Sequence, residues 1–173
     1  QNVGIIMDDS FLSKDWKISL VNDAMKCGYE NWEEEKFFEY VKTFGIEKDK
    51  KVRELSRGMK IKLMLSIALS HKANLLILDE PTSGLDPSMR DELTDILKDF
   101  VEDENNTVLF STHITEDLDR IADYIIFIDD GKIIDSSSKE EFLEKYLVLK
   151  GGSEDKDLLK NFDVLGIKAN STS

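Results

Sequence analysis

Several residue types and patterns are scarce in this chain of 173 residues, and each scarcity excludes something. The single cysteine, Cys27, excludes an internal disulfide and fits a reducing compartment. Two prolines and nine glycines argue against a low-complexity chain. No apolar run approaches the roughly 20 residues that a membrane-spanning helix needs.

Net positive charge is also missing. The chain has 23 Lys and Arg residues against 36 Asp and Glu residues, which gives a formal net charge of −13. Binding to a nucleic-acid backbone needs clustered cations, so we expect no nucleic-acid partner. The acidic residues are spread along expected helices and turns, which indicates a solvated surface.

What is present is an alternation of apolar runs and amphipathic segments. The expected strands are residues 3–7, 75–78, 107–110, 124–128 and 132–134, the last two joined by a hairpin turn at Asp130-Gly131. The run at 75–78 has no polar alternation, which is typical of a strand covered on both faces. Strands that alternate with helices along the chain predict an α/β fold with a parallel sheet and right-handed crossovers.

Capping residues indicate where several helices begin. Asn31, followed by Glu34, predicts the start of one helix, and Ser138 with Glu141 predicts a capping box for another. Asp86-Pro87 suits the cap and first turn of a third. A further helix is expected over about residues 57–70. Its inner stripe should be Leu63, Met64, Ile67 and Ala68.

Two adjacent carboxylates, Asp79 and Glu80, follow the apolar run 75–78 directly. In α/β proteins the carboxyl end of a buried strand is where ligands bind. Phosphoryl transfer needs a carboxylate that holds a metal and a group that orients or deprotonates water, and two acids can divide these roles. Ordinary loop acids or helix caps are the alternative. The continuation Pro81-Thr82-Ser83-Gly84-Leu85-Asp86 favours the catalytic interpretation.

The sequence Ser56-Arg57-Gly58 opens the helix expected over 57–70. Free backbone N–H groups and the positive end of the dipole suit a helix N-terminus to a terminal phosphate. The serine hydroxyl adds a donor, and glycine permits close backbone approach. A serine N-cap beside a permissive glycine is the plainer alternative.

His113 follows the strand at 107–110 as Asp79 follows its own strand. Neighbouring strands would place both residues at the same edge of the sheet, where a histidine can hydrogen-bond a phosphate or an attacking water. A local structural role is the alternative for a lone histidine, and we expect that role for His71 near a helix end.

The order and spacing of these motifs resemble the nucleotide-binding domain of ABC transporters. The matching segments are Leu55-Ser56-Arg57-Gly58-Met59 (signature), Leu75 to Glu80 (Walker B), Ser83-Gly84-Leu85-Asp86 (D-loop) and His113 (switch histidine). The resemblance covers residues 1–146 and implies a P-loop NTPase-like parallel sheet flanked by helices. It also implies a helical signature subdomain at about 12–71. Residues 147–173 would be a C-terminal extension or the start of a small accessory element.

The resemblance implies a role for each motif residue. Asp79 would hold Mg²⁺, Glu80 would polarise the attacking water, and His113 would contact the γ-phosphate of ATP. The residues expected at the nucleotide are Ser56, Arg57, Gly58, Met59, Ser83, Gly84, Asp86 and His113. Among them Ser56, Gly58 and Met59 would face a nucleotide held by a second subunit, and Asp86 would help link the two sites.

The chain departs from the family pattern at several points. Asp8, or Asp9, stands where the family has glutamine or glutamate, and Asp8 is the second candidate metal ligand. Arg57 replaces a glycine of the signature, and Met59 replaces a glutamine.

The phosphate cradle G-x-x-x-x-G-K-[ST] is also missing, since the one Gly-Lys dipeptide is Gly131-Lys132 and Ile133 follows it. The family has the cradle before the segment Gly4 to Asp8. We therefore expect a chain truncated at its N-terminus that binds and hydrolyses little ATP alone.

The resemblance implies an ATP-hydrolysing subunit that powers a separate membrane permease. It would work with a second ATPase subunit, as a homo- or heterodimer, at the cytoplasmic face of the membrane. Tyr29 to Glu35 and Leu147 to Gly152 resemble bacterial ABC-2-type exporters. The alternatives are a soluble ABC-type ATPase that acts on ribosomes and a non-hydrolysing regulatory or interaction domain on the same fold. Intact Asp79, Glu80 and His113 count against the last.

Overall fold

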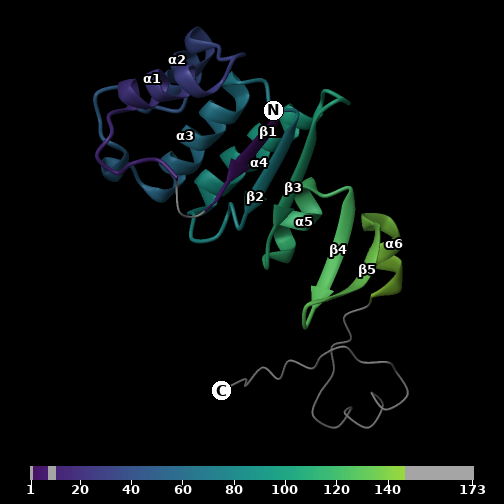
Figure 1. Ribbon diagram of the computed structural model, residues 1–173. Coiled ribbons are helices and arrows are strands. Elements are labelled where there is room, and N and C mark those ends of the chain that lie inside the picture. The colour runs from purple at the N-terminus through teal and green to yellow at the C-terminus, as the bar shows by residue number, and fades with distance from the viewer. Residues whose placement is uncertain (1, 8–10, 147–173) are drawn as a thin grey trace, which may run out of the picture. The chain divides into compact units, whose positions relative to one another are not determined.

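A computed structural model describes residues 2–7 and 11–146 of the chain (Figure 1). The chain divides into two compact units, Gln1–Ala122 and Asp123–Ser173. The domain boundary expected at residue 146 falls at the end of the described residues and stays a prediction. The segment 147–173 lies outside them, and so do Asp8 and Asp9.

Three parallel strands form the sheet of the first unit. They are β1 (Val3–Ile6), β2 (Leu75–Asp79) and β3 (Thr107–Ser111), in the spatial order β1-β2-β3. The register places Asp79 opposite Ser111. The parallel α/β fold is confirmed, and β2 and β3 end at the same edge of the sheet.

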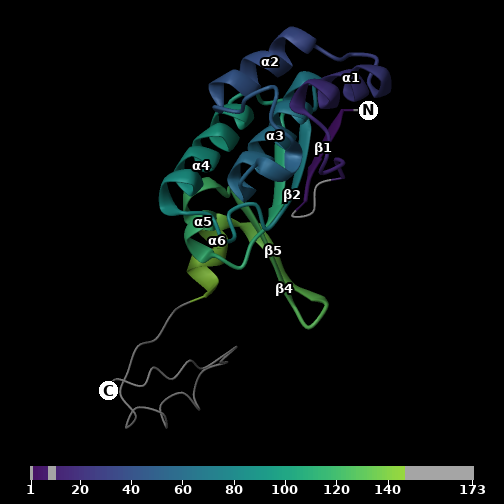
Figure 2. The same ribbon diagram turned by 90° about the vertical axis from the view of Figure 1, so that its left-hand side faces the viewer.

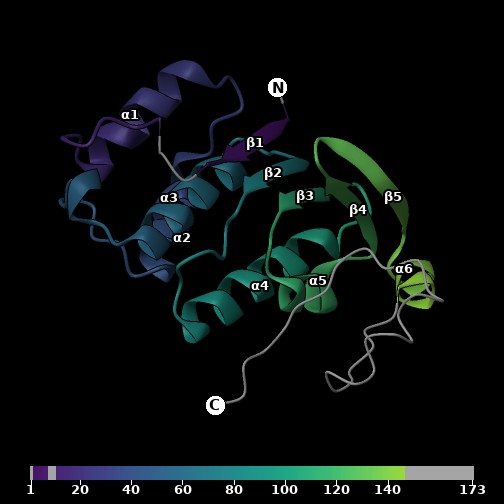
Figure 3. The same cartoon turned by 90° about the horizontal axis from the view of Figure 1, so that it is seen from below.

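One face of this sheet is covered by α3 (Arg57–Ser70) and α4 (Pro87–Val101), as Figures 2 and 3 show. The shared core is Ile6, Ile61, Met64, Leu65, Ala68, Ala73, Leu76, Leu78, Leu93, Leu97 and Phe100. A Cβ on Gly4 would lie 2.5 Å from Ala68 Cβ, so β1 can approach α3 only where the side chain is missing.

The opposite face of the sheet is only partly covered by the described residues. Ile5 and Leu109 are each 52% exposed there, and Ile77 is half-buried. The expectation that β2 is buried on both faces is therefore met on one face, where Leu76 and Leu78 are buried. The difference arises because both packed helices, α3 and α4, lie on that face.

A second apolar cluster joins α3 to α1 (Ile18–Gly28), α2 (Glu34–Thr43) and the 3₁₀ turn η1 (Val52–Glu54). Its members are Leu12, Ile18, Val21, Phe37, Val41, Ile46, Val52, Leu55, Leu63 and Ile67. The inner stripe expected for α3 is buried, but it divides between the two clusters. Because α3 packs on both sides, it is apolar around most of its circumference, as buried helices are.

The predicted caps are confirmed for α3 and α4 and wrong for α2. The Met59 N–H donates to Ser56 Oγ (3.3 Å), and the Met89 N–H donates to Asp86 Oδ1 (3.1 Å). In α2 the N-cap is Glu33, whose side chain makes no capping hydrogen bond. A tertiary contact sets this start instead, because the Glu33 N–H donates to the Ser70 carbonyl at the end of α3 (2.9 Å).

The first unit ends with α5 (Thr115–Ile121). In the second unit β4 (Tyr124–Asp129) and β5 (Lys132–Ser138) form an antiparallel hairpin, followed by α6 (Lys139–Lys145). Asp130 and Gly131 both have positive φ, which confirms the tight turn. The capping box of Ser138 and Glu141 is confirmed too. Every helix in the described part of the chain is too short or too polar to cross a membrane.

Candidate functional site

Polar residues from β2 and β3 meet at the carboxyl edge of the sheet. Ser111 is central, because its Oγ donates to Asp79 Oδ1 (2.7 Å) and accepts from the Glu80 N–H (3.0 Å). We call Asp79, Glu80, Ser111 and His113 the sheet-edge cluster. The sequence predicted that Asp79 and His113 share this edge, and the structure adds Ser111.

Glu80 adopts a backbone conformation that is rare outside glycine, with φ of +46°. Strained positions of this kind concentrate at functional sites, where the surrounding structure holds them. The turn directs the Glu80 carboxylate to His113, whose Nδ1 lies 2.8 Å from Glu80 Oε2. Because a carboxylate only accepts, the histidine donates from Nδ1 in this contact.

The side chains of Glu80 and His113 remain open to solvent. They are 34% and 68% exposed respectively. The pair therefore combines a fixed mutual geometry with access for a ligand or a water molecule, which a general base and a phosphate-contacting group both require.

A second group of motif residues forms what we call the signature corner, made of residues 56–59 and 83–86. Gly58 is buried, and a Cβ there would run into the Cε of Met89 and lie 3.5 Å from Leu85 Cδ2. Gly84 has φ of +68°, and a Cβ there would lie 3.0 Å from an Arg57 guanidinium nitrogen. The two motifs are thus one packed surface, at which α3 and α4 both begin.

Polar groups at the signature corner face outward. Ser56 and Asp86 are exposed while each also caps its own helix. Two helix N-termini at one corner supply free N–H groups and positive dipole ends, which suits an anionic ligand.

Few side chains of the sheet-edge cluster could bind a divalent cation. Within residues 2–7 and 11–146, no three His, Cys, Asp or Glu side chains come together to hold a metal by themselves. Asp79 and Ser111 nevertheless offer oxygen atoms at one point. Mg²⁺ is commonly held by one or two carboxylates together with substrate phosphates, so the residues present fit such a shared site.

His71 lies apart from both groups, at the C-cap of α3. Its ring is buried and stacks on Tyr29, with centroids 4.2 Å apart and an interplanar angle of 5°. Burial lowers the pKa of this imidazole from its ordinary value of 6.5. These surroundings are typical of a histidine with a structural role.

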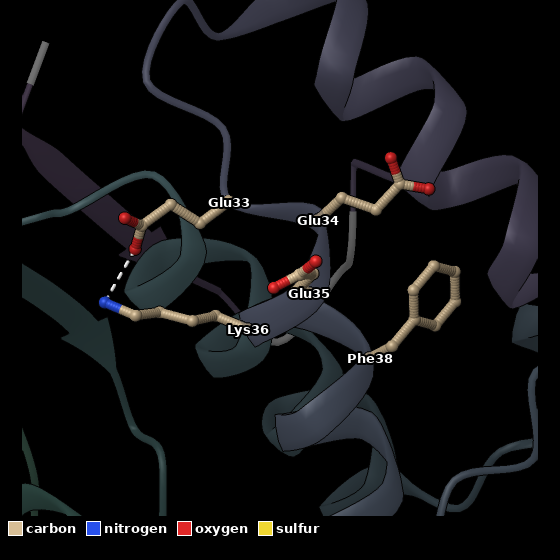
Figure 4. A pocket seen from close by; sticks show the side chains of 5 residues that line it. All are labelled: Glu33, Glu34, Glu35, Lys36 and Phe38. Carbon is tan, nitrogen blue, oxygen red and sulfur yellow. Dashed lines mark ion pairs between the residues drawn. The ribbon is translucent and has the colours of Figure 1, made fainter.

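A surface depression at the start of α2 contributes nothing to either group (Figure 4). It is lined by Glu33, Glu34, Glu35, Lys36 and Phe38. Hydrogen bonds from Lys36 and Lys72 lower the pKa of Glu33, which keeps its carboxylate charged.

A family model and several known proteins are similar to the part of the chain that carries these motifs. Residues 22–119 match the family model described as "AAA domain, putative AbiEii toxin, Type IV TA system". The lantibiotic transport ATP-binding protein SrtF of Streptococcus pyogenes is 46% identical over 83 residues, which are 48% of this chain and 36% of SrtF. The chain thus spans just over a third of the length of SrtF.

Two solved structures share the fold. An ATP-binding subunit of an ABC transporter superposes with a TM-score of 0.73, at 21% identity, over 92% of this chain and 68% of that one. The ATP-binding cassette MJ0796, solved as a dimer in a post-hydrolysis state with ADP and Pi, gives a TM-score of 0.67 at 20% identity. That match covers 79% of this chain and 62% of the cassette.

Proposed function

Because this chain belongs to the AAA-type ATPase family, as part of an ATP-binding domain of the ABC transporter kind, we propose that the whole protein hydrolyses ATP to power a separate membrane permease. The sheet-edge cluster carries this proposal. It joins an exposed metal-competent carboxylate, Asp79, to a Glu80–His113 pair at the edge where α/β proteins bind ligands.

In this proposal the residues of the cluster divide the chemistry. Asp79, oriented by Ser111, would hold Mg²⁺ together with phosphate oxygens, and the ion would neutralise charge on the transferred phosphoryl group. Glu80 accepts a hydrogen bond from the attacking water and takes up its proton as a general base. His113 donates from Nδ1 to the Glu80 carboxylate, and in its doubly protonated form it would also donate from Nε2 to a γ-phosphate oxygen.

The signature corner would serve a second ATPase subunit. Its outward groups, Ser56 and the first-turn N–H groups of α3, would contact a nucleotide held by that subunit, together with Arg57, Gly58 and Met59. Ser83, Gly84 and Asp86 would reach the same interface from the D-loop. The dimeric state of the structural neighbour MJ0796 supports this arrangement.

Since this sequence contains no glycine-rich cradle, we further propose that the cradle lies elsewhere in the whole protein. The exporter-like segments Tyr29 to Glu35 and Leu147 to Gly152 favour a bacterial export system. The ATPase would then lie peripherally at the cytoplasmic face of the membrane.

Phosphate release by the whole protein tests this function. We expect Mg²⁺-dependent ATP hydrolysis that Asp79→Asn lowers by at least about tenfold, because a ligand to the ion loses its charge. Asp99→Asn, an exposed acid on α4, is the matched control and should retain wild-type turnover. Absence of hydrolysis by the wild-type protein, or stimulation by ribosomes but not by a permease, would overturn the proposal.

A further inference from the structure

A buried carboxylate links the two loops that carry the catalytic pair. Asp117, on α5, is 0% exposed. Its Oδ2 accepts a hydrogen bond from Thr82 Oγ1 at 2.5 Å and a longer one from Thr112 Oγ1 at 3.3 Å. Thr82 lies two residues after Glu80, and Thr112 directly precedes His113.

The other oxygen of Asp117 faces a third element. Asp117 Oδ1 lies 4.0 Å from Arg90 Nε on α4, and among the described residues neither atom has a hydrogen-bond partner. A charged group without water is costly to bury unless it is paired or hydrogen-bonded. The two threonine hydroxyls and the nearby guanidinium therefore explain how this carboxylate is tolerated here.

We propose that Asp117 is a positioning residue, which ties the D-loop to the switch-histidine segment through Thr82 and Thr112 and so sets the distance between Glu80 and His113. This inference rests on the proposed ATPase function and deepens it. Asp117 is fully buried, so it would act only through the residues that it contacts. A shift of one loop relative to the other would separate the Glu80–His113 pair, now at 2.8 Å.

Local hydrogen bonds hold the segment that carries Thr112 and His113 in a rigid turn. The Ile114 N–H donates to Thr112 Oγ1 (3.0 Å), and the Asp117 N–H donates to the Ile114 carbonyl (3.1 Å). On the D-loop side Thr82 is 1% exposed, and the Leu85 N–H donates to its carbonyl (3.2 Å). Both loops are thus compact turns joined at one carboxylate oxygen, and removal of a single hydroxyl should loosen one loop against the other.

Steady-state ATP hydrolysis by the whole protein tests the tie. Thr82→Val keeps the shape and removes the donor, so kcat should fall about tenfold or more while KM for ATP changes by less than about twofold, since small misplacements of catalytic groups cost rate. Thr82→Ser restores the hydroxyl and should restore kcat to within about twofold. Ser66→Ala, which removes another buried hydroxyl (2.8 Å from the Lys62 carbonyl), should leave kcat unchanged.

A double-variant cycle separates positioning from general stability. In a His113→Ala background the Thr82→Val change should lower kcat by less than about twofold, because the pair that it positions is already gone. The same loss in both backgrounds would overturn the inference. So would wild-type kcat in folded Thr82→Val and Asp117→Asn variants. An inactive wild-type protein would instead overturn the proposed ATPase function.

Discussion

The sheet-edge cluster and the signature corner belong to the same compact unit, yet different forces hold them. In the cluster, hydrogen bonds of 2.7–3.0 Å join Asp79, Glu80, Ser111 and His113. In the corner, Gly58 and Gly84 allow close packing against Met89 and Arg57. Hydrogen bonds specify distance and direction, which reacting groups need, whereas packing specifies shape and leaves Ser56 and Asp86 exposed to a partner. Substitutions should therefore affect chemistry in the cluster and stability or assembly in the corner.

The largest effect should come from Glu80→Gln. The amide is isosteric but cannot take up a proton, so kcat of the whole protein should fall by roughly 10²–10⁴-fold. ATP binding should persist and ATP-bound dimers should accumulate. Single-turnover phosphate release measures the rate, with Glu102→Gln on the exposed end of α4 as control. Normal turnover in Glu80→Gln would remove this residue from the proposed role.

Ser111→Ala should have the next largest effect. It deletes the donor to Asp79 and one of the two acceptors of the Glu80 N–H, which also donates to the Ser111 carbonyl (3.2 Å). Without the hydrogen bond from Ser111, Asp79 is no longer held in one orientation, and small misplacements of a catalytic group cost rate, so we expect a fall in kcat of roughly tenfold to a hundredfold. The stability of the fold, followed by urea unfolding, should change by less than about 1 kcal/mol because the site is exposed. A stability loss without a rate loss would make Ser111 a structural residue only.

In the corner the expected effect is on stability. Gly58→Ala places a methyl group where Met89 Cε now lies; this atom ends a flexible side chain that can shift, so the net loss of stability should stay below about 1 kcal/mol. Met89→Ala frees that space, so the double variant should regain most of the loss in a urea-unfolding cycle. Additive losses would show that the two side chains do not compete for this space.

The smallest effect lies at the other end of α3. Since burial lowers the pKa of His71, the unfolded state binds the proton more readily, and stability is lost as pH falls below the ordinary pKa of 6.5. His71→Phe keeps an aromatic ring against Tyr29 and removes the titration. The free energy of unfolding should then fall less between pH 7 and pH 5 than in the wild type, while ATP hydrolysis keeps its pH profile. An unchanged pH dependence of unfolding would contradict the burial effect.

Much of the fold was predictable because its signals are local. The apolar run at β2, the cap at Asp86 and the turn at Asp130-Gly131 each depend on neighbouring residues. The start of α2 was not predictable from its neighbours in sequence, because a hydrogen bond to the distant Ser70 carbonyl sets it, rather than a cap at Asn31. The sequence predicted one buried apolar stripe on α3. The structure buries this helix against two separate clusters, which the sequence pattern does not reveal.

By itself the sequence determined the motifs, their order along the chain and the family to which they belong, because these depend on residue type and spacing. Only the tertiary structure decided which of these residues work as pairs. Ser111 reaches Asp79 across 32 positions of sequence, and Thr82 reaches Asp117 across 35. Such contacts follow from the parallel register of β2 and β3 and from the packing of α5, and no local pattern of side chains records them.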